Sequence, residues 1–75
     1  MITISTGDFY YFYEDDSIWL ITAIDSRISL TLIAGNHPSS ITILPEYIHN
    51  FGRYLGNIAI TPTSQLKNFY PELFI

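Results

Sequence analysis

The chain has 75 residues, and three basic residues face seven acidic ones, which gives a formal net charge of −4. Hydrophobic residues make up 48% of the sequence and charged residues only 13%, against the usual ~25%, so an intrinsically disordered chain is excluded. The absence of cysteine excludes a disulfide framework, a cysteine-ligated zinc site and a cysteine nucleophile. General binding to the DNA backbone is disfavoured, because that affinity comes from lysine and arginine.

The length predicts a single small domain over residues 1–75. The N-terminal segment lacks a basic region, and no apolar run approaches the ~20 residues of a membrane span. We therefore expect a cytoplasmic protein without a signal peptide or a membrane segment.

Residues that favour β-structure dominate the sequence, with 13 isoleucines, 7 threonines and 12 aromatic residues. Turn residues divide them into six expected strands, which are Ile2–Ser5, Phe9–Tyr13, Ile18–Ile24, Ile28–Ala34, Ile41–Leu44 and Asn57–Thr61. The connections are short, whereas parallel strands need long crossovers, so an antiparallel meander is favoured.

One segment changes to a helical period. Apolar residues recur at helical spacing at Tyr47, Ile48, Phe51, Tyr54 and Leu55. This predicts a helix over Glu46–Leu55, with Pro45 in its first turn and Gly56 at its end. Because Gly52 in the interior costs about 1 kcal/mol relative to alanine, we expect this helix to be short or bent. A second helical turn is expected to start at Ser64 and to end before Pro71.

The predicted fold is therefore mostly β, a small antiparallel meander or SH3-like barrel of five to six strands with one short helix near residues 46–55. The outline, which opens with Gly7-Asp8-Phe9, is similar to that of SH3-like or Tudor-like small barrels. This resemblance concerns the order of strands and turns, so it implies a fold and no ligand-binding residues.

Hairpin pairing predicts that both faces of the sheet are apolar. A four-residue loop over Glu14–Ser17 pairs Phe12 with Trp19, and a three-residue loop over Asp25–Arg27 pairs Trp19 with Ile33. One face then forms a core of Phe9, Tyr11, Tyr13, Ile18, Leu20, Ile24, Ile28, Leu30 and Leu32. The opposite face collects Tyr10, Phe12, Trp19, Ile21 and Ile33.

An antiparallel sheet in water normally has one polar face, so the second aromatic face requires a cover. One interpretation is that the Tyr47–Leu55 helix or the Phe69–Ile75 tail of the same chain covers it. The other is that it binds a protein partner or a second copy, because aromatic residues are enriched at such surfaces. On this hypothesis the partner-binding residues are Tyr10, Phe12, Trp19, Ile21 and Ile33.

No pattern indicates catalysis or a bound cofactor. The acidic run Glu14-Asp15-Asp16 lacks the alternating ligands, glycine and distal glutamate of a calcium loop. His37 and His49 lack the carboxylate spacing of a zinc-binding helix, and no serine lies in a Gly-x-Ser-x-Gly motif. We therefore expect no enzyme activity, no cofactor and no metal.

The favoured function is a small non-enzymatic protein-interaction module, an accessory, regulatory or inhibitor protein that binds a partner or itself through the aromatic face. The alternative is a nucleic-acid-related protein. A single-strand binder needs a basic groove, for which only Arg27, Arg53 and Lys67 are available. An acidic mimic that blocks a nucleic-acid-binding protein needs most of its carboxylates on one surface, namely those of Asp8, Glu14, Asp15, Asp16 and Asp25.

Overall fold

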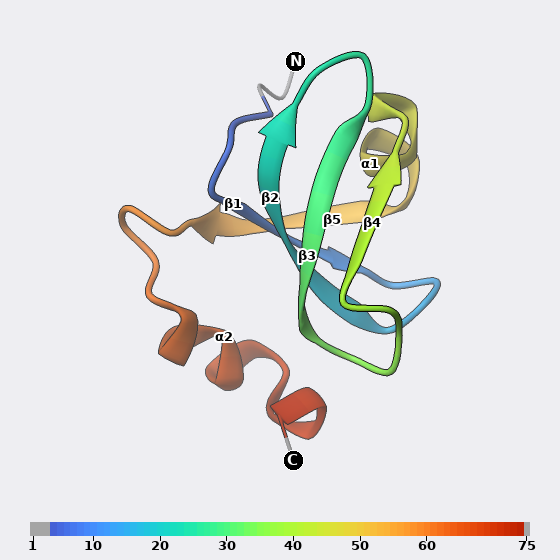
Figure 1. Cartoon of the computed structure of the whole chain (residues 1–75). Helices are drawn as coiled ribbons and strands as arrows, with labels where there is room; N and C mark the ends of the chain where they lie inside the picture. Colours follow the sequence, from blue (N-terminus) through green and yellow to red (C-terminus); the bar gives the residue numbers. More distant parts are fainter. Residues whose placement is uncertain (1–3, 75) are drawn as a thin grey trace.

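A computed structural model describes residues 4–74, which form a five-stranded antiparallel sheet with short helices on both sides (Figure 1). The strands are β1 (Asp8–Phe12), β2 (Ser17–Ile24), β3 (Ile28–Ala34), β4 (Ser40–Ile43) and β5 (Gly52–Asn57). Helix α1 (Pro45–Phe51) joins β4 to β5. Helix α2 (Thr63–Phe69) and the 3-10 helix η1 (Pro71–Phe74) follow β5. The predicted mostly-β antiparallel class is confirmed.

The sheet order is β4-β3-β2-β1-β5, so the first four strands form a meander and the fifth returns to the far side of β1. The sheet is strongly curved in Figure 1, and β4 and β5 are its two edges. Helix α1 lies behind the end of β4, on the path from one edge to the other (Figure 1). The sheet is thus open rather than closed, with α1 near the opening.

The predicted helix over Glu46–Leu55 is too long. Helix α1 ends at Phe51, and the backbone of Gly52 is already extended and paired with Phe12 in the ladder between β1 and β5. A Cβ atom on Gly52 would lie 2.8 Å from the Ile48 carbonyl oxygen, so glycine allows the chain to turn sharply from helix into strand.

The other predicted elements differ less from the observed ones. Only Asn57 of the predicted strand Asn57–Thr61 belongs to a strand, because the chain turns after it. Ile4 and Ser5 lie outside the strands, and the rest of the predicted strand Ile2–Ser5 is outside the described residues. The second helical turn is confirmed as α2.

The hairpin of β1 and β2 differs in register by two residues from the predicted one. Its four-residue loop runs from Tyr13 to Asp16, so Tyr10 rather than Phe12 faces Trp19. Since side chains alternate with a period of two, this difference leaves each residue of the two strands on its predicted face.

A bulge in β2 changes the face of β3. Ile24 faces Ile28 as predicted, but Ile21 faces Leu30, so Thr22 is an extra residue in β2. The extra residue reverses the alternation between the two strands. Ile28 and Leu30 consequently join the aromatic face that contains Ile21, instead of the opposite face.

A second irregularity corrects the position of Ile33. Ile18 faces Ala34 and Trp19 faces Leu32, so Ile33 is the extra residue of β3. The prediction that Ile33 shares a face with Trp19 is therefore wrong. Ile33 is half-buried and packs against the cluster on the opposite face of the sheet.

Each face of the sheet has its own apolar cluster. The aromatic face contains Tyr10, Phe12, Trp19, Ile21, Ile28, Leu30 and, from α1, Ile48. The opposite face contains Phe9, Ile18, Ala34 and, from α2, Leu66. Helix α1 thus covers the aromatic face, and the C-terminal helices cover the other, which gives a layer of helix on each side of the sheet.

Candidate functional site

The four strand residues expected to bind a partner on β1 and β2 lie inside the protein. Tyr10, Phe12, Trp19 and Ile21 are each no more than 2% exposed. The indole N–H of Trp19 donates to the Ser17 hydroxyl at 2.7 Å, and Tyr47 of α1 meets Phe12 edge-on at 5.3 Å. The chain's own helix therefore covers this face, and a binding surface has to be sought elsewhere.

An apolar groove lies between β4 and α1. Its volume is about 320 Å³, and its lining residues are Ile43, Leu44, Glu46, Tyr47, Asn50 and Phe51. Tyr47 and Phe51, four residues apart on the helix, form one wall with their ring centroids 4.9 Å apart. Leu44 is 51% exposed. Large apolar side chains thus face solvent at the open edge of the sheet.

The sequence at the junction of β4 and α1 explains why the groove stays open. Pro45 occupies the first turn of α1 and keeps the preceding Leu44 extended, with ψ of 149°. The Leu44 carbonyl accepts a hydrogen bond from the Tyr47 N–H at 3.0 Å, which starts the helix directly at the end of the strand. Leu44 therefore lies at the corner between strand and helix, outside both packing faces.

Strand β4 also presents unpaired backbone groups beside this groove. The Leu32 N–H donates to the Ser39 carbonyl, and the pairing of β3 and β4 continues from there. Hydrogen-bonded and non-hydrogen-bonded pairs alternate in an antiparallel ladder, so Ser40 and Thr42 belong to the non-hydrogen-bonded pairs. Their N–H and C=O groups point away from β3, and in the part of the chain that the structure describes no strand lies on that side.

The two sheet edges differ in how they are protected against pairing. Strand β5 carries the exposed Arg53, and its ladder with β1 contains an irregularity between Phe9 and Tyr10. Charges and bulges on an edge strand discourage the addition of a further strand. Strand β4 has neither a charged residue nor an irregular pairing with β3. The edge formed by β4 is therefore more open than that of β5 to the addition of a further strand.

Carboxylates adjoin the groove. Glu46 lines it, and the Tyr47 hydroxyl donates to the Asp15 carboxylate at 3.4 Å. Burial raises the pKa of Tyr47, and the negative charges of Asp15 and Glu14 raise it further. Asp15 and Asp16 belong to the loop of residues 13–16 between β1 and β2, which we call the acidic loop. The Asp16 carboxylate accepts a hydrogen bond from the Tyr11 hydroxyl at 2.5 Å, and this hydrogen bond helps to raise the pKa of Tyr11 to about 12.

The basic side chains of the C-terminal half do not neutralise this loop. Arg53 donates to the Tyr70 hydroxyl at 3.3 Å, and Lys67 lies 6.0 Å from the centre of the Phe74 ring. Both contacts involve the C-terminal helices on the opposite face of the sheet. The groove consequently combines apolar walls with carboxylates, one of which accepts a hydrogen bond from the Tyr47 hydroxyl.

A second depression of about 320 Å³ lies on the other side of the acidic loop. Its lining residues are Asp15, Asp16, Gly35, Asn36, His37, Glu72 and Leu73. A ring nitrogen of His37 lies 3.1 Å from the Asp15 carbonyl oxygen. Residues 4–74 contain no group of three or more histidine, cysteine, aspartate or glutamate side chains positioned to hold a metal ion. This depression therefore offers negative charge without a metal-ligand set.

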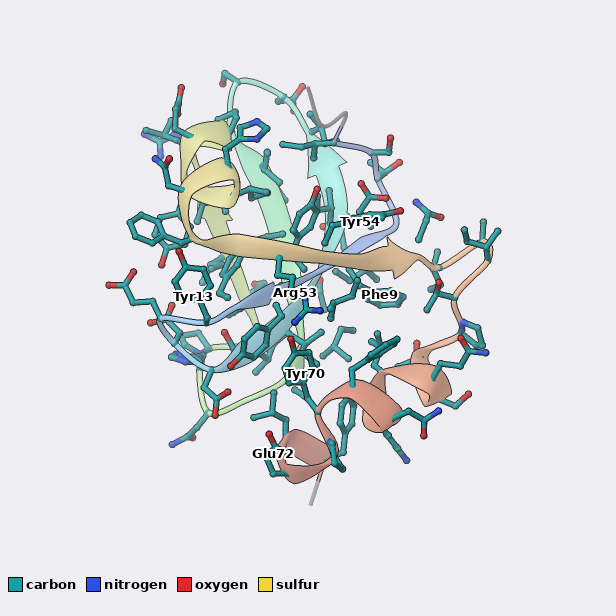
Figure 2. All side chains as sticks on the ribbon, turned by 180° about the vertical axis from the view of Figure 1, so that it is seen from behind. Phe9, Tyr13, Arg53, Tyr54, Tyr70 and Glu72 are labelled. Carbon is teal, nitrogen blue, oxygen red and sulfur yellow. The ribbon has the colours of Figure 1, made fainter. Side chains whose placement is uncertain are left out.

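Aromatic residues near β5 form a structural contact rather than a free surface. Figure 2 shows Arg53 and Tyr70 pointing toward one another between β5 and the C-terminal helices. The Tyr70 ring stacks on Tyr11 at 4.1 Å, and both residues are half-buried. These contacts attach the C-terminal segment to the sheet, so their aromatic surface is already occupied.

The five carboxylates named for the acidic-mimic alternative are not gathered in one place. Asp8 is 3% exposed, and its carboxylate accepts hydrogen bonds from the Ser5 N–H and the Asn57 amide. Asp25 lies in the β2–β3 turn, at the opposite end of β2 from Asp16. The five carboxylates that a mimic would require therefore do not line one surface.

The groove is not apparent from the sequence. There Leu44 falls at the end of an expected strand, and Tyr47 and Phe51 fall in the apolar stripe of an expected helix. The available signal was a short strand without charge, Ser40–Ile43, followed at once by Leu44 and Pro45. Reading that signal requires knowing that β4 is an edge strand, and only the sheet order shows this.

Comparison of the chain with protein-family models, curated proteins and solved structures found no match. Within residues 4–74, none of the helices has the length and apolar character needed to cross a bilayer.

Proposed function

We propose that this protein is a small non-enzymatic interaction module that binds an extended segment of another protein as an additional strand on β4. The observation that carries the proposal is that β4 points the backbone groups of Ser40 and Thr42 away from β3 and leads into the apolar groove at Ile43 and Leu44. In this mode of recognition the main chain supplies the hydrogen bonds, and pockets for alternate side chains supply the selectivity.

The geometry supports weak and reversible binding. Ser40 and Thr42 together offer two N–H and two C=O groups, each worth about 0.5–1.5 kcal/mol net when paired. Alternate side chains of the added strand would face Tyr47 and Phe51, and burial of one aliphatic side chain contributes about 1.5–3 kcal/mol. Because association itself costs at least ~4 kcal/mol, a short segment should bind with a micromolar to millimolar dissociation constant.

A proline substitution tests the mode of binding. Thr42→Pro removes the outward N–H, and the hydrogen bonds between β3 and β4 remain because Thr42 does not donate to β3. Thr42→Val retains the N–H and serves as the matched control. The probe is the peptide acetyl-Lys-Val-Thr-Val-Thr-Val-Lys-amide, titrated into the isotopically labelled protein and followed by amide chemical shifts.

We expect the peptide to shift the amides of β4 and α1 in the natural protein and in Thr42→Val, and to lose its effect in Thr42→Pro. Amide spectra of the free variants verify that both remain folded. Equal binding by Thr42→Pro, or shifts confined to residues away from β4 and α1, would contradict the proposal.

A further inference from the structure

We infer that the segment received by β4 is basic, with aliphatic side chains at alternate positions and lysine or arginine next to them. This inference rests on the proposed strand addition and specifies the chemistry of its occupant. The groove supplies apolar contacts through Leu44, Tyr47 and Phe51, and carboxylates adjoin it on both the helix and the loop.

The charged groups that line the groove or act on its residue Tyr47 are carboxylates. Glu46 lines the groove, Asp15 accepts a hydrogen bond from the groove residue Tyr47, and Glu14 is close enough to raise the pKa of Tyr47. Arg53 and Lys67 are engaged with Tyr70 and Phe74, on the opposite face. A cationic segment would therefore meet carboxylates near the place where its backbone pairs with β4.

The carboxylates also lie on parts of the fold that are fixed relative to the groove. The Tyr13 hydroxyl donates to the Asn50 carbonyl at 2.8 Å and so ties the acidic loop to α1, and Figure 2 shows Tyr13 between these two segments. Tyr47 adds the second link through Asp15. The loop therefore presents its negative charge at a constant position beside the apolar wall.

A second copy of this chain is a poorer occupant. Pairing of β4 with β4 around a two-fold axis uses the same patch on both subunits, so it would place Glu46 and Asp15 of one copy in the interface with those of the other. Each chain also carries a net charge of −4. A strand of four residues supplies few hydrogen bonds to overcome this repulsion.

The test removes charge separately from the peptide and from the protein. The first probe is the lysine peptide above, and the second carries acetyl-lysine at the same two positions, which preserves length and removes charge. The groove variant is Asp15→Asn with Glu46→Gln, and the control variant is Asp25→Asn with Glu72→Gln. Both variants remove two negative charges, but Asp25 and Glu72 do not line the groove.

We expect the lysine peptide to bind the natural protein at least about fivefold more tightly than the acetyl-lysine peptide, as two partly exposed ion pairs would give. The preference should disappear in the groove variant and persist in the control variant. It should also decrease as salt rises, because partly exposed pairs are screened.

Three results would overturn the inference, and they differ in what else they affect. Equal binding of both peptides at β4 refutes the charge preference and leaves strand addition intact. Binding of neither peptide at β4 refutes the proposed function as well. A dimer detected by light scattering, with β4 protected from amide exchange, identifies a second copy as the occupant and refutes the basic partner.

Discussion

Replacement of Trp19 by aspartate should unfold this protein, because the structure places Trp19 in the core and not on a binding surface. Trp19 is 2% exposed, lies 6.5 Å from the Phe12 ring between centroids and donates its indole N–H to the Ser17 hydroxyl at 2.7 Å. Ser17 is itself fully buried, so the substitution also leaves its hydroxyl without that donor.

The expected loss is comparable with the whole stability of a domain of this size. Removal of a buried tryptophan side chain costs about 3–5 kcal/mol, and a buried carboxylate without a partner adds several more. The unpaired Ser17 hydroxyl contributes about 1–3 kcal/mol. A chain of 75 residues has a free energy of unfolding of roughly 4–11 kcal/mol, at about 0.05–0.15 kcal/mol per residue. Trp19→Asp should therefore be largely unfolded.

Circular dichroism and urea denaturation measure this directly. The matched control is Tyr13→Asp, which places the same charge at an aromatic residue that is 58% exposed and should cost about 1 kcal/mol for the lost hydrogen bond to Asn50. A folded Trp19→Asp with a cooperative urea transition near that of the natural protein would refute the placement of Trp19. It would restore the aromatic face as a candidate partner surface.

Two further predictions concern the packing on each face of the sheet. Within residues 4–74 the buried Tyr10 hydroxyl has no hydrogen-bond partner, so Tyr10→Phe should leave the free energy of unfolding at neutral pH unchanged or raise it by about 1 kcal/mol, as measured by urea denaturation. Burial raises the pKa of Tyr10 from 10.0 to about 12, so its neutral form stabilises the fold fully below pH 10 and this contribution is lost between pH 10 and 12. Tyr10→Phe should reduce that alkaline loss of stability. An identical fall in the natural protein and in Tyr10→Phe would show that ionisation of Tyr10 is not its cause. Leu66→Ala should cost about 2–5 kcal/mol in urea denaturation and expose α2 and η1 to amide exchange, whereas Phe69→Ala on the same helix, 56% exposed, should have a small effect.

The fold class was predictable because local chemistry and tertiary packing agree over most of the chain. The strand predicted over Ile28–Ala34 has its observed bounds, and the turns over 13–16 and 25–27 lie within one residue of the predicted loops. The predicted four-residue loop starts one residue too late, which shifts the register of β1 and β2 by two residues. Because side chains alternate with a period of two, each residue of these strands still lies on its predicted face.

The prediction failed where one residue changes the direction of side chains. Thr22 and Ile33 are each an extra residue in their strand, and nothing in the local sequence distinguishes them from paired neighbours. The position of a bulge depends on how the curved sheet packs against its neighbouring layers. Counting residue pairs outward from a hairpin loop therefore cannot locate it. Gly52 likewise follows the last residue of α1, whereas the spacing of apolar residues alone predicts that the helix continues to Leu55.

The sequence by itself determined that this chain is mostly β, with more apolar residues than a single sheet face can bury. It also located the excess in Tyr10–Tyr13 and Ile18–Ile21, which some layer must cover. Only the tertiary structure decided which layer. Helix α1 supplies Ile48 and Tyr47 to that face, and α2 supplies Leu66 to the other. Of the two edge strands, β4 is the one without a charged residue or an irregular pairing, and its position at the edge follows from the sheet order alone.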